Sequence, residues 1–259
     1  INTRLAFNVP WMGVVAMAFA KYPFFYNSLW QYINPLTKSI EFDELCKKLI
    51  IISKKKALEL KPKSLRKNLK KIGYNNYETK KINEVNQIFT TGNMPYLIMA
   101  TIARIFLEEG ELLNTKSFKK NNRTSIKSDK NYLLLIEQHH ANKSLKEIYK
   151  SIKGNLGLPF LNTDYRAFAR WPSYFEMSWK SFLPALLSKK YEEKVLEIHN
   201  FIIKESLLLP NPNKIKSIQI INAAKKDKKL NEIKKVVNLF QWLLPGLITN
   251  VAFMREQIK

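Results

Sequence analysis

Apolar residues recur every three or four positions along most of this chain, with lysines between them, which is the pattern of amphipathic helices. In the stretch 40–60, for example, Leu45, Leu49 and Ile52 lie at helical spacing. Prolines and short polar stretches divide the pattern into segments. It predicts helices over residues 10–22, 24–33, 40–60, 64–72, 77–91, 94–109, 132–140, 143–152, 159–170, 173–182, 188–208, 214–224 and 230–254. Strands separated by glycine-rich turns are not visible, so we predict an all-α fold.

Residues 10–35 match residues 159–184 at an offset of 149 positions, with seven identities in 26 positions. The identical pairs are Pro10/Pro159, Ala18/Ala167, Phe19/Phe168, Ala20/Ala169, Pro23/Pro172, Trp30/Trp179 and Pro35/Pro184. The match returns at the far end of each half, where residues 94–98 fall on residues 244–248 at an offset of 150. We interpret the chain as a duplicated helical unit of about 100 residues.

The duplication sets the predicted domain organisation. We expect a first repeat over 1–112, a linker with helices over 113–153 and a second repeat over 154–259, all within one compact domain. The polar, basic stretch 114–130 is interpreted as a surface linker. Two tandem copies usually pack about a pseudo-twofold axis, so we expect an intramolecular pseudo-dimer.

Composition excludes several classes of function. At 259 residues with 46% apolar content the chain can bury a real core. The sequence has no GxGxxG, Walker A or GxSxG motif and no HExxH among its three histidines, so we expect neither cofactor nor metal. Its single cysteine, Cys46, allows no internal disulfide, which fits a cytoplasmic protein.

The apolar run Val9 to Ala20 follows Arg4 and has the outline of a secretory signal. The same pattern recurs at 159–170, in the interior of the chain, so we expect a folded helix in both places. Neither run reaches the roughly 18 apolar residues of a membrane span. We therefore expect no membrane partner.

The net charge of +23 invites a nucleic-acid function, because it comes from 44 Lys and Arg against 21 Asp and Glu. The excess is mostly lysine in short runs, and no known nucleic-acid-binding motif accompanies it. A solvated basic surface that attracts small anions is the favoured interpretation, and no nucleic-acid partner is expected. A non-enzymatic basic module stays open as an alternative.

Positions that differ between the two copies indicate function, because packing explains those that both copies keep. Asp164 is such a position: it lies in an apolar stripe, and its counterpart is Val15. A buried carboxylate is costly unless it is paired or kept for reactivity, and burial would raise its pKa. The alternatives without a catalytic role are an ion pair of Asp164 with Arg166 or Arg170, or a favourable position of the carboxylate in the first turn of a helix.

The neighbours of Asp164 differ between the copies in the same sense. Thr163 stands opposite Val14 and Asn162 opposite Gly13, which places a hydroxyl and an amide beside the carboxylate. These groups could hold a water or a substrate carboxylate. A surface asparagine and a threonine bonded to its own helix are the alternatives.

Other candidates have structural interpretations of equal or greater weight. Asn93 precedes Met94 and is interpreted first as a helix N-cap. Trp11 is aromatic in both copies, so packing explains it first, although an indole N–H could also cradle an anion. We interpret Glu137 as a solvated side chain and the adjacent His139 and His140 as structural.

Residues 158–172, Leu-Pro-Phe-Leu-Asn-Thr-Asp-Tyr-Arg-Ala-Phe-Ala-Arg-Trp-Pro, followed by Tyr174 and Trp179, resemble the central motif of the group I 2-haloacid dehalogenases. The segments from Val9 to Trp30 and from Phe89 to Leu97 resemble other recurring segments of that family. The resemblance covers most of the chain and is weakest in the lysine-rich linker and around 60–85.

The resemblance implies an all-helical pseudo-dimer that acts on both enantiomers of short 2-halocarboxylic acids. In the mechanism that it implies, Asp164 activates a water that attacks the halogen-bearing carbon directly and inverts its configuration. Thr163 stands where the family has a serine, and Trp11 matches a tryptophan of the halide and substrate pocket. Asn93 matches an asparagine near the substrate. Val14 falls where that pocket has another aromatic residue, which is a departure.

Hydrolysis of a carbon–halogen bond in a small anionic substrate is thus the leading hypothesis. A second hypothesis keeps the fold but assigns a different small anion, and a third is the basic module described above. A homodimer remains open as a further partner.

Overall fold

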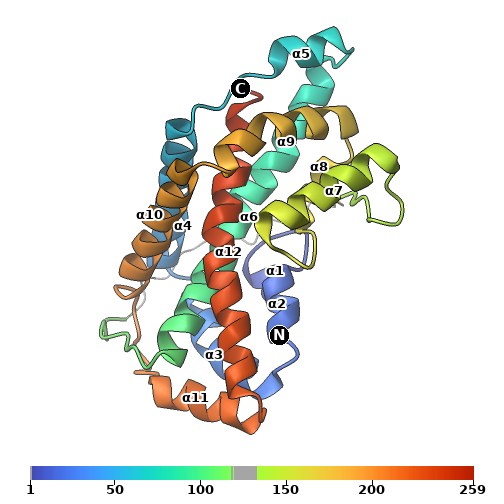
Figure 1. Ribbon diagram of the computed structural model, residues 1–259. Coiled ribbons are helices and arrows are strands. Elements are labelled where there is room, and N and C mark those ends of the chain that lie inside the picture. Colours follow the sequence, from blue (N-terminus) through green and yellow to red (C-terminus); the bar gives the residue numbers. More distant parts are fainter. Residues whose placement is uncertain (1, 118, 120–132) are drawn as a thin grey trace. The chain divides into compact units, whose positions relative to one another are not determined.

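The computed structural model describes residues 2–117, 119 and 133–259, and these form helices and connecting loops with no strand (Figure 1). The helices are α1 (Thr3–Ala6), α2 (Val14–Phe19), α3 (Pro23–Leu36), α4 (Ile40–Glu59), α5 (Arg66–Lys71), α6 (Asn76–Leu107), α7 (Lys143–Leu156), α8 (Thr163–Phe168), α9 (Pro172–Leu186), α10 (Lys189–Ser206), α11 (Ser217–Lys226) and α12 (Leu230–Glu256). The all-α prediction is confirmed. Much of the predicted linker 114–130 lies outside the described residues.

The chain divides into two compact units that are discontinuous in sequence. Unit 1 comprises residues 1–52, 91–131 and 196–247, and unit 2 comprises residues 53–90, 132–195 and 248–259. Each unit therefore takes its residues from both predicted repeats. The repeat boundaries at 112 and 154 remain a prediction about the sequence.

Unit 1 is built on α3, with α2 and α11 packed against it (Figure 1). Phe19 of α2 meets the ring of Phe25 edge-on, with 5.4 Å between the centroids. The carboxylate of Asp227 accepts hydrogen bonds from the backbone N–H groups of Phe24 and Phe25 at 3.2 and 2.8 Å. It thereby satisfies N–H groups that the first turn of α3 leaves without helical partners.

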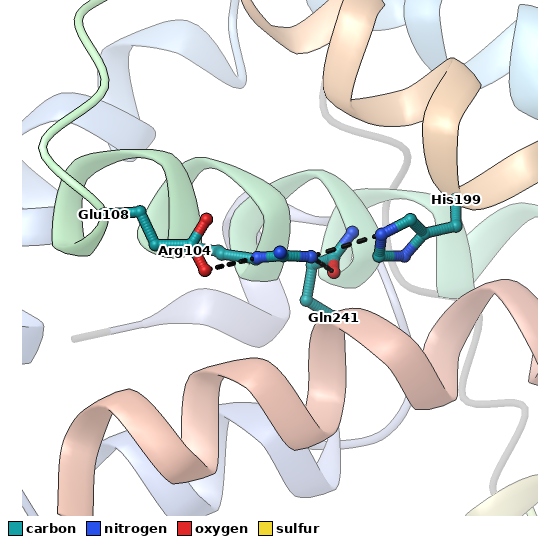
Figure 2. Close-up of polar contacts among 4 residues, drawn as sticks. All are labelled: Arg104, Glu108, His199 and Gln241. Atoms are coloured by element: carbon teal, nitrogen blue, oxygen red, sulfur yellow. Dashed lines mark hydrogen bonds and ion pairs between the residues drawn. The ribbon is translucent and has the colours of Figure 1, made fainter. Parts of the chain in front are cut away.

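A polar cluster that is only partly buried also lies in unit 1 (Figure 2). Arg104 of α6 donates to the side-chain oxygen of Gln241 at 2.6 Å and to the carboxylate of Glu108 at 2.8 Å, and its Nη1 lies 3.2 Å from Nε2 of His199. The His199 ring stacks on Trp242 with 3.5 Å between the centroids. The cluster joins α6, α10 and α12.

Unit 2 packs α7 against α9 (Figure 1). The indole N–H of Trp179 donates to the Ser151 hydroxyl at 3.0 Å, and this bond ties the two helices. Phe182 contacts Phe253 of α12 with centroids 4.7 Å apart. The large aromatic residues of α9 thus form much of this core.

Matched positions in the two halves have matched local structure. The helices α2 and α8 begin at Val14 and Thr163, 149 residues apart, and α3 and α9 begin at Pro23 and Pro172, also 149 apart. Both prolines occupy the first helical turn, where the missing N–H costs nothing.

The starts of α4 and α10 agree as well. Ser39 accepts a hydrogen bond from the N–H of Phe42 at 3.1 Å, and Ser188 accepts one from the N–H of Tyr191 at 3.2 Å. The offset of 149 therefore extends to these helices.

The helix starting at each motif is shorter than predicted. We expected helices over 10–22 and 159–170, but α2 begins at Val14 and α8 at Thr163. Gly13 and Asn162 have extended backbones, with ψ of 140° and 152°, and stand as N-caps instead. The prolines at 10 and 159 belong to the preceding loops.

Two other predictions about the helices are wrong. The ranges 77–91 and 94–109 form one helix, α6, which continues through Pro95. An internal proline costs about 3 kcal/mol, but the residues from 92 to 100 are all buried, and their packing offsets that cost. The predicted helix 132–140 is absent over its described part, 133–140, which is a loop ending in a turn.

Among the described residues, α12 alone is long and apolar enough to cross a membrane, and 72% of its most apolar window is buried in the protein. The core helix of a soluble protein passes the same test, so this finding is weak support for a membrane span.

Candidate active site

The start of α8 in unit 2 buries three consecutive polar residues. Asn162, Thr163 and Asp164 are 5%, 4% and 2% exposed. Asp164 lies in the first turn of α8, so the alternative of a first-turn position is confirmed by the structure. Its counterpart Val15 is also 2% exposed, so the corresponding place in the other copy is filled by an aliphatic side chain.

The hydroxyl of Thr163 has a cationic partner one turn along the same helix. Nη2 of Arg166 donates to Oγ1 of Thr163 at 3.3 Å, and Nη1 donates to the carboxylate of Glu137 at 2.7 Å. Because the hydroxyl accepts from Arg166, its own proton is left to donate elsewhere. Glu137 is therefore bonded to α8, although its side chain stays 40% exposed, as its interpretation as a solvated side chain predicts.

The loop before α7 is hydrogen-bonded to the same helix, α8. The N–H of Ile136 donates to the carbonyl of Arg166 at 3.0 Å, and the hydroxyl of Tyr149 donates to the carbonyl of Ile136 at 2.7 Å. Position 17, opposite Arg166 in the first copy, is a methionine with 48% exposure. The sequence analysis did not predict this contact between the loop and α8. The difference between Met17 and Arg166 at matched positions could have indicated it.

Asn162 has a buried amide oxygen with no hydrogen-bond partner among the described residues. A buried polar atom left without a partner costs about 1–3 kcal/mol, so a donor is expected at this position. The matching residue, Gly13, instead uses its backbone N–H, which donates to the hydroxyl of Tyr96 at 2.8 Å. The amide of Asn162 thus belongs to the candidate site.

Unit 1 holds Trp11 against α6. Trp11 is 8% exposed, and its ring centroid lies 6.2 Å from that of Tyr96. The Tyr96 hydroxyl donates to the carbonyl of Trp11 at 3.2 Å. A Cβ atom built on Gly92 would lie 2.3 Å from the indole ring, so only glycine fits beneath it.

Asn93 lies inside α6 and is 3% exposed. The N-cap interpretation is therefore wrong, because α6 is continuous across this position and no helix begins there. It follows Gly92, on which Trp11 packs. Val14, the first residue of α2, is partly exposed.

The predicted site residues thus fall into two sets. Trp11, Val14 and Asn93 belong to unit 1, where Gly92 and Tyr96 bring the first of them to α6. Thr163 and Asp164 belong to unit 2 and are neighbours on α8. A buried carboxylate beside a hydroxyl and an amide can act as a general base on a small polar molecule. Among the described residues no three His, Cys, Asp or Glu side chains gather as metal ligands.

Comparison with known proteins identifies relatives along nearly the whole chain, although no family model matches it. The chain is 35% identical over 218 residues to the (R)-2-haloacid dehalogenase of Rhizobium sp. (strain NHG3), covering 82% of this chain and 83% of the relative. It is 30% identical over 264 residues to the (R)-2-haloacid dehalogenase of Pseudomonas putida, covering 99% of this chain and 86% of the relative.

Solved structures agree with these relatives. A D-2-haloacid dehalogenase mutant superposes with a TM-score of 0.88 at 29% identity, over 99% of this chain and 89% of the other. The complex of a D-2-haloacid dehalogenase with L-LA gives the same values, and a mutant complex with D-2-CPA gives a TM-score of 0.86 at 28% identity over the same shares. With relatives at this identity matched over more than four fifths of their length, the chain belongs to the 2-haloacid dehalogenase family.

Proposed function

We propose that this protein is a hydrolase that releases halide from short 2-halocarboxylic acids, with Asp164 as the general base. The observation that carries the proposal is a carboxylate 2% exposed at a position where the other copy has a valine. The fold has no need of a charge there, and the chain belongs to a family whose members remove halide. Family membership favours this enzyme over the non-enzymatic basic module.

In the proposed reaction, Asp164 removes a proton from a water as the water oxygen attacks the carbon that carries the halogen. The new C–O bond forms as the C–halogen bond breaks, and the bonding electrons leave with the halide. The products are a 2-hydroxy acid of inverted configuration, a halide ion and a proton on Asp164. A positioned base contributes roughly 100- to 10,000-fold to such a step. No cofactor takes part in this scheme.

The groups beside Asp164 support this scheme. The Thr163 hydroxyl accepts from Arg166 and can direct its own proton to the substrate carboxylate. The buried amide oxygen of Asn162 can accept from the attacking water and so fix its second proton. Together these two contacts would orient a nucleophile and a substrate for Asp164.

The unit 1 residues are proposed as substrate-binding groups. Trp11 is rigid because it packs on Gly92 and Tyr96, and an indole N–H can donate to a carboxylate or a departing halide. Asn93 is a buried amide on α6, which suits it to a polar contact with the substrate. Val14 contributes only an aliphatic wall.

We propose hydrolysis of the (R) enantiomer, because both curated relatives carry that enantiomer in their names. The resemblance found in the sequence implies action on both enantiomers, so (S) acids are part of the test. Halide release should be measured with (R)- and (S)-2-chloropropionate separately.

The decisive experiment compares Asp164→Asn with Asp227→Asn. Both remove one carboxylate charge, but Asp227 caps α3 in unit 1. We expect Asp164→Asn to lower halide release at least about 100-fold and Asp227→Asn to keep it. Turnover that survives Asp164→Asn would overturn the assignment of the base.

A different small anionic substrate is the second candidate, and the departure at Val14 favours it. Failure to release halide from every 2-halo acid tested, with Asp164 still required for hydrolysis of another anion, would support it. The pseudo-dimer arrangement, a homodimer and a cytoplasmic location also remain proposals, and neither a nucleic-acid nor a membrane partner is proposed.

A further inference from the structure

A chain of buried polar side chains links α8 to α10 and α12 in unit 2. Nδ2 of Asn250 donates to the hydroxyl of Tyr165 at 2.8 Å, and the hydroxyl of Tyr191 donates to Oδ1 of Asn250 at 2.6 Å. Tyr165 directly follows Asp164 on α8. The amide of Asn250 thus has a partner at each end, and one of them belongs to the helix that carries the carboxylate.

Tyr165 is held both at its hydroxyl, by the hydrogen bond from Asn250, and at its ring, by packing. It is 0% exposed, and its ring packs near those of Phe175 and Trp179, with centroid distances of 6.3 and 6.1 Å. Burial raises the pKa of both Tyr165 and Tyr191 well above the usual value of 10, so both hydroxyls keep their protons. The three side chains therefore form a neutral network with defined donors and acceptors.

The first copy has no such network. At the offsets of 149 and 150, Tyr165, Tyr191 and Asn250 fall on Ala16, Phe42 and Ala100. The alignment at Phe42 rests on the matched serine caps of α4 and α10.

These three counterparts are 2%, 3% and 0% exposed, so they are as buried as the polar residues they match. The fold thus accepts apolar side chains at all three positions. The polar versions occur only in the copy that carries Asp164.

Position 16 in α2 is an alanine, whereas the matched position 165 in α8 carries a phenol. The phenol hydroxyl can fix α8 by a hydrogen bond, which the alanine methyl group cannot do for α2. The helix α8 has only six residues, so its own hydrogen bonds fix its rotation weakly. A hydrogen bond to a side chain of the long helix α12 supplies that restraint. Because Asp164 and Tyr165 are consecutive, any rotation of α8 that breaks the Asn250 bond also turns the carboxylate.

We infer that Asn250, acting through Tyr165 and supported by Tyr191, is a positioning residue for Asp164. The inference rests on the proposed function of Asp164 and adds residues that do not touch the substrate. Reactive groups must be held within about 0.5 Å of their productive geometry, and this network holds the helix that carries the base.

The test compares Tyr165→Phe, Tyr191→Phe and Asn250→Leu with Tyr32→Phe. Tyr32 is a matched control, because its buried hydroxyl donates to the carbonyl of Pro210 at 2.9 Å in unit 1. Tyr32→Phe and Tyr165→Phe each remove one hydroxyl from a buried ring. Halide release from (R)-2-chloropropionate is measured as kcat, KM and the pH profile of kcat, well below each variant's melting temperature.

We expect Tyr165→Phe and Asn250→Leu to lower kcat at least about 10-fold, to leave KM within about twofold and to move the acidic limb of the pH profile. Tyr191→Phe should have a smaller effect in the same direction, because it leaves the bond to Tyr165 in place. Tyr32→Phe should resemble the unaltered protein in all three quantities.

Two outcomes separate this inference from the proposed function. If Asp164→Asn is inactive while Tyr165→Phe matches Tyr32→Phe in kcat and pH profile, the positioning role is wrong and the base stands. If Asp164→Asn keeps its activity, the base assignment itself is wrong. Should Asn250→Leu fail to fold, Tyr165→Phe decides alone, because it removes a single oxygen atom.

Discussion

The guanidinium of Arg166 donates to the hydroxyl of Thr163 across 3.3 Å, one turn along α8. Thr163 immediately precedes Asp164, and Arg166 is in turn held by Glu137 at 2.7 Å. The cation therefore fixes which lone pair of the hydroxyl is used as an acceptor. Because this hydroxyl already accepts from Arg166, its proton is available to donate to a different group.

Two substitutions of Thr163 distinguish the contribution of its hydroxyl from that of its branched shape. Thr163→Val keeps the branched side chain but removes the donor, and we expect kcat/KM for halide release to fall about 10- to 100-fold, the loss of one hydrogen bond to a charged group. Thr163→Ser keeps the hydroxyl and should remain within a few-fold. Equal activity of the Val and Ser variants would show that the hydroxyl plays no part.

Gly92 is predicted to be required for the place of Trp11. A methyl group at position 92 would lie 2.3 Å from the indole ring, so Gly92→Ala must displace the ring or the helix. We expect a loss of about 1–3 kcal/mol in the free energy of unfolding and a rise in KM. Urea denaturation and halide-release kinetics measure the two effects.

Gly154→Ala is the matched control for Gly92. Gly154 also lies inside a helix, α7, but a Cβ atom there would meet nothing within 4 Å. This variant should stabilise the protein by about 0.5–1 kcal/mol, since alanine is the better helix former. A similar effect of the two substitutions would contradict the close packing of Trp11.

Helical class and the special status of Asp164 could both be derived from the sequence. Periodicity gave most helices, and comparison of Asp164 with Val15 identified the carboxylate that packing does not require. The ends of the helices were harder to predict from the sequence, because they depend on tertiary contacts. The N–H of Gly13 bonds to Tyr96, and α6 passes through Pro95 within a buried segment.

The supporting residues of the site were the least predictable part. Glu137 looks like any exposed carboxylate until the loop before α7 brings it to Arg166. Tyr165 and Asn250 lie 85 positions apart, and no periodicity connects them. The copy comparison that singled out Asp164 would have marked both, because their counterparts, Ala16 and Ala100, are apolar.

Substitution of Val14 tests the departure from the resemblance that removes an aromatic side chain. A phenylalanine here restores the aromatic residue that the resemblance implies, and its ring edge can stabilise a departing halide. Because Val14 is only partly buried, Val14→Phe should fold and should raise kcat/KM for 2-chloropropionate several-fold. Met17→Phe adds a ring on the same helix at a position 48% exposed and should change nothing. No response to Val14→Phe would favour the different small anion as substrate.

His199 is predicted to make the protein sensitive to acid. Burial and the neighbouring Arg104 cation lower its pKa from 6.5 to about 4. It lies in the polar cluster with Arg104, Glu108 and Gln241 (Figure 2). The folded state keeps this ring neutral between pH 6.5 and 4, while the unfolded chain binds a proton there. The free energy of unfolding therefore falls as the pH drops through that window.

The size of the effect follows from the shift, since one pKa unit corresponds to about 1.4 kcal/mol. Urea denaturation at pH 7 and pH 4.5 should show a loss of about 2 kcal/mol that His199→Gln lacks. Glutamine does not titrate, and its oxygen can still accept from Arg104. His139→Gln, at an exposed position, should keep the full loss. If both variants lose the same stability as the unaltered protein on acidification, the acid response arises from other groups, and the neutral ring stacked on Trp242 is not its cause.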